Sequence, residues 1–193
     1  MSISVLDPIV TLEDQPNITH LVQLWQAIRS DPTVFGALMD NFPQHLEDFL
    51  LPVDQGTMRL WIVLLNEETA GALWIHDIGL LGYNSCWTGI YYMPEHRRHV
   101  GAAAANAFHD TLKASDIEHI FCAICQSNQA SQKHARKNGY IDAGVYPQWG
   151  WFGGSLQDTM LFSMRSDDHE ILWQQAAHRA AQQQAWRPSA MLT

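Results

Sequence analysis

The chain has 193 residues, of which 47% are hydrophobic and 16% are charged. These proportions suit one globular domain with a substantial core. Its 11 basic and 20 acidic residues give a net charge of −9. This balance argues against duplex DNA or an anionic membrane surface as the main partner, because both usually require a basic face.

We expect no leader peptide and no membrane span. The first twenty residues contain Asp7, Glu13 and Asp14 and no basic n-region, and no apolar run is long enough to cross a bilayer. Three cysteines do not make a disulfide framework, so we expect a reducing, cytoplasmic compartment. Cys122 and Cys125 form a C-x-x-C pair, but in a strand they would face opposite sides, so we interpret them as buried core thiols.

The N-terminal part of the chain predicts one strand and two helices. Residues 3–12 are rich in β-branched side chains and favour a strand. Residues 19–28 place apolar side chains at helical spacing, with Thr19 as the N-cap. A second helix is predicted to begin at Pro43 and to end before Pro52.

Three strands with an antiparallel arrangement follow, at 58–65, 70–81 and 85–93. The polar residues 66–69 predict a hairpin connection between the first two strands. A helix is then predicted from the alanine run to about Lys113.

The C-terminal half alternates strands and helices. Its predicted elements are a strand at 118–125, a helix at 129–137, strands at 140–152 and 158–164, and a helix at 168–185. Asn138 and Gly139 form a C-terminal helix signal. Because a helix joins the strands 85–93 and 118–125, these should run parallel with a right-handed crossover. The predicted class is α+β (α/β-like), a mixed, mostly antiparallel sheet flanked by helices.

The stretch 96–108 suggests an anion site. Ala102 to Ala105 favour a helix start, and Gly101 permits close approach of another group. A helix N-terminus presents unpaired N–H groups at a positive end, which suits the phosphates of a cofactor. His96, His99 and His109 are joined by no carboxylate or cysteine at metal-ligand spacing, so we expect no metal site.

Two motifs in this region resemble those of the GCN5-related N-acetyltransferase (GNAT) superfamily. The first is Gln/Arg-x-x-Gly-x-Gly/Ala, matched by Arg98, Gly101 and Ala103, although the spacing from Pro94 is one residue longer than usual. The second is an Asn, a small residue three later and a later Gly-aromatic pair, matched by Asn128, Ser131, Gly139 and Tyr140. The resemblance covers roughly residues 57–165. It implies a GNAT-like domain at 1–166, followed by an extra C-terminal helix and tail at 167–193.

The resemblance implies that acetyl-CoA is the co-substrate. In this family, backbone N–H groups after the fourth strand wrap the pyrophosphate, and the pantetheine arm fills a gap between the fourth and fifth strands. Here the residues so assigned are Tyr92, Met93, Arg98, His99, Val100, Gly101, Ala102, Ala103 and Asn128, with Arg97 as an alternative source of charge.

The catalytic residues are less defined. Ala135 occupies the position where many relatives carry a tyrosine acid, and the strand 85–93 contains no carboxylate base. His76, Tyr91 and His134 are the remaining candidates for proton transfer.

Two functions therefore stay open. The first is an N-acetyltransferase that moves an acyl group directly to an amine of a small molecule or a protein. The second is a GNAT-fold binding or assembly protein without catalysis, as among some phage-encoded relatives. The aromatic region around Trp149 and Trp151 predicts an acceptor pocket or an interface with a second copy or a partner, and the C-terminal helix is a further docking candidate.

Overall fold

A computed structural model describes residues 9–32, 34, 45–76, 78, 84–115 and 117–165. The C-terminal helix and tail expected at 167–193 lie outside the described residues, as do residues 3–8 of the first predicted strand. No described helix has the length and apolarity needed to cross a bilayer.

Seven strands form one sheet in the order β1-β2-β3-β4-β5-β7-β6. Their bounds are β1 Val10–Glu13, β2 Met58–Leu65, β3 Glu68–His76, β4 Ser85–Tyr92, β5 His119–Cys125, β6 Ile141–Phe152 and β7 Ser155–Arg165. Every neighbouring pair is antiparallel except β4 and β5, which are parallel. The predicted mixed, mostly antiparallel sheet and its parallel crossover are confirmed.

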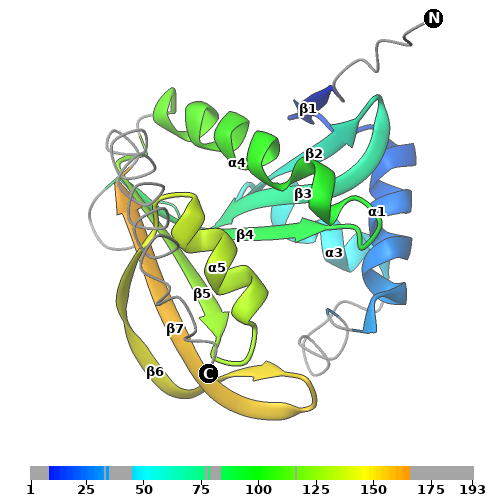
Figure 1. The fold of residues 1–193 in the computed structure, drawn as a ribbon. Coiled ribbons are helices and arrows are strands. Elements are labelled where there is room, and N and C mark those ends of the chain that lie inside the picture. The colour runs from blue at the N-terminus through cyan, green and yellow to red at the C-terminus, as the bar shows by residue number, and fades with distance from the viewer. Residues whose placement is uncertain are drawn as a thin grey trace, which may run out of the picture.

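Helices cover both faces of this sheet (Figure 1). The helices are α1 Ile18–Ser30, α3 Leu46–Asp54, α4 Arg97–Lys113 and α5 Gln129–Lys137. One core cluster joins the sheet to α4 and α5 and is centred on Trp61, Leu73 and Phe108. A second cluster joins the opposite face to α1, through Leu24 and Ile62. The strands contribute apolar side chains to both clusters, because successive side chains of a strand point to opposite faces of the sheet.

Three predicted boundaries need correction. The N-cap of α1 is Asn17, whose Oδ1 accepts from the His20 amide at 3.0 Å, and not Thr19. The second predicted helix does not end before Pro52, since α3 continues to Asp54. The Pro52 carbonyl accepts the Thr57 amide at 2.9 Å and the Thr57 hydroxyl at 3.1 Å, so hydrogen bonding continues past the proline. The strand predicted at 70–81 ends earlier, because β3 is Glu68–His76 and Ile78 lies in a turn; residues 77 and 79–81 of the prediction lie outside the described residues.

The start of α4 also differs from the prediction, with a consequence for the site. The helix begins at Arg97, and not at Ala102. The Met93 carbonyl accepts the His96 and Arg97 amides, which forms a tight turn directly after β4. Helical bonding therefore starts before the alanine run and includes residues that the sequence placed in a loop.

Candidate functional site

The parallel strands β4 and β5 separate after a short paired segment. They are in register only at Ser85–Trp87 against His119–Phe121. At the point of separation, the Thr88 hydroxyl donates to the Phe121 carbonyl at 3.3 Å. Beyond it β5 continues along β7 as far as Cys125, whereas β4 stays with β3 (Figure 1). We call this arrangement the fork, and Thr88 marks its closed end.

A cavity of about 800 Å³ occupies the fork. Its walls come from β4, β5, α4, α5 and the β6–β7 hairpin, and its lining is mostly apolar. This volume lies within the usual range for small-molecule and cofactor sites. Backbone groups of β4 that have no strand partner on this side face a space large enough for an extended ligand.

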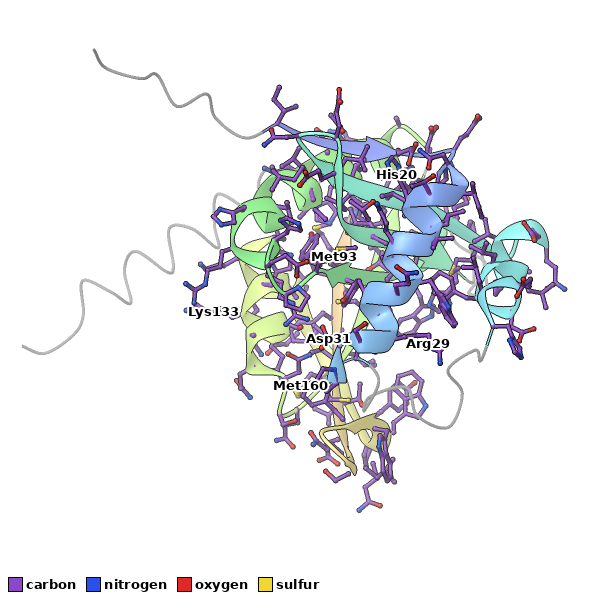
Figure 2. The ribbon with its side chains drawn as sticks, turned by 90° about the vertical axis from the view of Figure 1, so that its right-hand side faces the viewer. His20, Arg29, Asp31, Met93, Lys133 and Met160 are labelled. Atoms are coloured by element: carbon purple, nitrogen blue, oxygen red, sulfur yellow. The ribbon has the colours of Figure 1, made fainter. Side chains whose placement is uncertain are left out.

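An ion pair with one buried partner fixes the open end of β4. The Arg97 Nε donates to the Tyr92 carbonyl at 2.9 Å, and its guanidinium pairs with Asp31. The Asp31 side chain is only 3% exposed, whereas that of Arg97 is 43% exposed. Asp31 lies at the end of α1 remote from His20 (Figure 2). Arg97 thus connects α1, the last residue of β4 and the first turn of α4.

Of the residues assigned to coenzyme A from the sequence, Tyr92 and Asn128 line the cavity. Asn128 also caps α5, because its Oδ1 accepts from the Ser131 amide at 3.2 Å. Met93 is buried in the core cluster under α1. The other six, Arg98, His99, Val100, Gly101, Ala102 and Ala103, lie in the first two turns of α4.

The helical start of α4 changes which groups can meet an anion. The His99 and Val100 amides both donate to the His96 carbonyl, and the Arg97 amide donates to that of Met93. The Arg98 and His99 side chains remain exposed at the positive end of the helix. An anion at the start of α4 would therefore meet the exposed side chains of Arg98 and His99 rather than the loop of free amides that the sequence predicted.

The groups that approach Gly101 closely are the side chains of His134 and Tyr92. A Cβ at this position would lie 3.3 Å from Cε1 of His134 and 3.7 Å from the Tyr92 ring. The Tyr92 hydroxyl also donates to the Gly101 carbonyl at 3.3 Å. The absence of a side chain here lets α4 approach His134 of α5 and the end of β4.

The fork brings together two of the three predicted catalytic candidates. Tyr91 and His134 line the cavity, whereas His76 is paired in register with Trp87 at the closed end and does not. Burial lowers the pKa of His134, and Lys137 adds to this effect, so its ring is neutral at neutral pH. Burial and the nearby Asp31 raise the pKa of Tyr91 to about 12.

The β6–β7 hairpin closes one end of the cavity. Trp149 and Trp151 line it, although their side chains are 58% and 38% exposed. Between them, a Cβ on Gly150 would lie 2.4 Å from Oγ1 of Thr159 and 2.5 Å from Sγ of Cys125. Glycine is therefore required at position 150 for β6 to lie this close to Thr159 of β7 and Cys125 of β5. Trp149 and Trp151 both line the cavity and are partly exposed, so the acceptor-pocket and interface hypotheses both stay open.

Two pairs in the site have no local sequence signal. Asp31 and Arg97 are 66 residues apart, and His109 and Tyr140 are 31 apart, with the His109 Nε2 lying 3.2 Å from the Tyr140 hydroxyl.

The three cysteines are free thiols, with Cys122 and Cys125 both lining the cavity. Within the described ranges, no group of three metal-ligating side chains comes together.

This arrangement, with a split parallel pair and a helix that starts beside it, is the fold of the GNAT acetyltransferases. The chain is similar to spermidine N-acetyltransferase from Vibrio cholerae, solved with CoA and spermine, at 13% identity and a TM-score of 0.72, over 83% of this chain and 98% of that one. It is similar to Mycobacterium smegmatis RimJ, solved with CoA-disulfide, at 19% identity and a TM-score of 0.65, over 89% and 88%.

A third similar structure is the Salmonella typhimurium acetyl transferase that modifies the N-terminal serine of ribosomal protein L7/L12. Its identity is 18% and its TM-score 0.67, over 81% of this chain and 94% of that one. No protein-family profile matches the sequence, and no curated protein sequence matches it. At these identities the comparisons establish the fold, which confirms the predicted resemblance at that level.

Proposed function

We propose that this protein is an acetyl-CoA-dependent N-acetyltransferase that transfers an acyl group directly to an amine, in the cytoplasm. The observation that carries the proposal is the cavity of about 800 Å³ in the fork. A closed sheet would offer no such space, and an extended thioester needs both a long groove and unpaired strand backbone. Two structures with this fold were solved with CoA or its disulfide, which supports the assignment of the groove.

The phosphates of acetyl-CoA are assigned to the start of α4. Arg98 and His99 are exposed there, at the end of the helix that favours negative charge. The pantetheine arm then runs into the fork past Tyr92 and Asn128, which both line it. This direction places the thioester toward the closed end, near Thr88.

Transfer requires an unprotonated amine, a donor to the carbonyl oxygen and a proton for the leaving sulfur. We assign removal of the amine proton to water in the cavity, because His134 lies beside Gly101 and Tyr92, at the end of the fork away from Thr88. A covalent acyl-cysteine is not proposed, because burial raises the pKa of Cys122 to about 12 and also raises that of Cys125, which leaves little thiolate. The aromatic side chains Trp149 and Trp151 are assigned to the acceptor end.

Acetyl-CoA titration followed by thermal unfolding tests the proposal. A ligand at a hundred times its Kd stabilises the folded state by about 2.7 kcal/mol, which for a chain of this size raises the Tm by roughly 5–10 °C. Thiol release from acetyl-CoA is then measured across a panel of small amines and N-terminal peptides. Binding without thiol release would favour the assembly or binding protein, a reading motivated by Ala135 at the tyrosine position, and absence of binding would overturn the acetyltransferase.

Arg98→Ala should weaken acetyl-CoA binding by about tenfold, because one charge-assisted contact to phosphate contributes roughly 1.5 kcal/mol. Isothermal titration at low and high salt measures the effect, which should shrink at high salt because exposed charges are screened. The matched control is Lys113→Ala, which removes the same charge from the exposed C-terminal end of α4. Equal Kd values for the two variants would show that the phosphates bind elsewhere.

A further inference from the structure

A buried polar pair lies under the closed end of the fork. His109 of α4 is 2% exposed and Tyr140 is 4% exposed, and the His109 Nε2 lies 3.2 Å from the Tyr140 hydroxyl. Both residues line the cavity. The pair therefore combines complete burial with access to the space that the proposed function assigns to acetyl-CoA.

The position of the Tyr140 hydroxyl is fixed relative to the fork. Thr88, whose hydroxyl bridges to the Phe121 carbonyl where the strands separate, interacts with the Tyr140 hydroxyl. Cys122, the first β5 residue beyond the segment paired with β4, lies close enough to the Tyr140 hydroxyl to raise its pKa. The hydroxyl thus belongs to the point where β4 and β5 diverge, on the face of the sheet covered by α4 and α5.

A thiolate is unfavourable at this depth. Burial raises the pKa of the Cys86 and Cys122 thiols to about 12, so the surroundings strongly disfavour charged sulfur. The same burial raises the pKa of Tyr140 well above its ordinary value and keeps its hydroxyl protonated. A sulfur expelled here needs a proton, and Tyr140 has one at neutral pH.

The other tyrosines of the cavity are less suited to this task. The Tyr92 hydroxyl donates to the Gly101 carbonyl, at the opposite end of the fork from Thr88. Tyr91 belongs to the core cluster on the α1 face and lies near Asp31. Ala135, at the position of the family tyrosine, leaves no hydroxyl on α5 there.

We propose that the Tyr140 hydroxyl, supported by His109, is the proton donor to the leaving thiolate in this protein, an inference that rests on the acetyltransferase function proposed above. The amine nitrogen forms a bond to the thioester carbonyl carbon, and the carbon–sulfur bond breaks with its electron pair going to sulfur. Sulfur takes the proton from Tyr140 Oη, while the His109 Nε2–H donates to the phenolate oxygen. The proton lost by the amine passes to water, and water returns one to Tyr140.

Tyr140→Phe tests the proposal with a readout that separates chemistry from binding. We expect kcat for thiol release to fall about 100-fold, because general acids typically contribute 10²–10⁴. The Kd of acetyl-CoA and the KM of the amine should stay unchanged, since the ring and its packing remain. A purely structural role would instead move binding and the Tm together. The matched control is Tyr146→Phe, which removes the same hydroxyl from a side chain 49% exposed on β6.

Two substitutions of His109 keep the test decisive if Tyr140→Phe fails to fold. His109→Gln keeps an N–H donor near the phenol and should retain most of kcat, whereas His109→Leu should lose it with acetyl-CoA binding intact. If the wild type releases thiol and either Tyr140→Phe or His109→Leu has the same kcat as the wild type, this inference is overturned and the proposed function stands. Wild-type protein that releases no thiol with any amine would overturn the proposed function, and this inference with it.

Discussion

Ala135→Trp should abolish stabilisation by acetyl-CoA. Ala135 is buried, lines the cavity and belongs to the core cluster on the α4 and α5 face. An indole there grows into the space assigned to the thioester, so the expected Tm rise of roughly 5–10 °C at a hundred times Kd should disappear. Overpacking costs about 1–3 kcal/mol, so the variant should melt below the wild type while remaining folded.

The control places the same side chain on the opposite side of the same helix. Lys133 is exposed on α5 (Figure 2), and Lys133→Trp should bind acetyl-CoA as the wild type does. Circular dichroism and thermal unfolding with and without acetyl-CoA measure both variants. A full ligand-induced shift in Ala135→Trp would mean that acetyl-CoA does not enter the fork.

Arg97→Ala should destabilise the protein by about 2–3 kcal/mol. The substitution removes the guanidinium from the buried Asp31 carboxylate and removes the donor to the Tyr92 carbonyl. Breaking a fully buried pair typically costs 3–5 kcal/mol, and the partial exposure of Arg97 places the expected value below that range. Urea unfolding gives the difference in free energy.

A second arginine–aspartate pair provides the comparison. Arg136 binds Asp142 through two contacts of 3.0 and 3.1 Å, but both side chains are about half exposed. Arg136→Ala should therefore cost about 1 kcal/mol or less. If the two substitutions were equally destabilising, burial of Asp31 would not be what makes the first pair important.

Local signals predicted most of the fold correctly. The alternating apolar strands, the Asn138–Gly139 helix end and the crossover between β4 and β5 all follow from short-range patterns. The errors fall at element ends. Asn17 replaces Thr19 as a cap, and α4 starts at Arg97, because the Met93 and His96 carbonyls accept the amides that follow them. Such bonds depend on backbone geometry that residue types constrain only weakly.

Part of the site was predictable and part was not. The motifs directed attention to Tyr92, Asn128 and the start of α4, which lie at the fork or beside it. They gave no sign of the Asp31–Arg97 pair, nor of the buried contact between His109 and Tyr140. Each of these pairs joins residues from different elements, so its existence depends on how the helices pack on the sheet.

The sequence by itself determined the order and type of the elements, because periodicity and turn chemistry act over a few residues. It also determined the acidic balance and the alanine at the tyrosine position. Only the tertiary structure decided that the fork is open and which hydroxyl lies at its closed end. Those features arise from contacts across tens of residues, where the free energy of burial and pairing outweighs local preference.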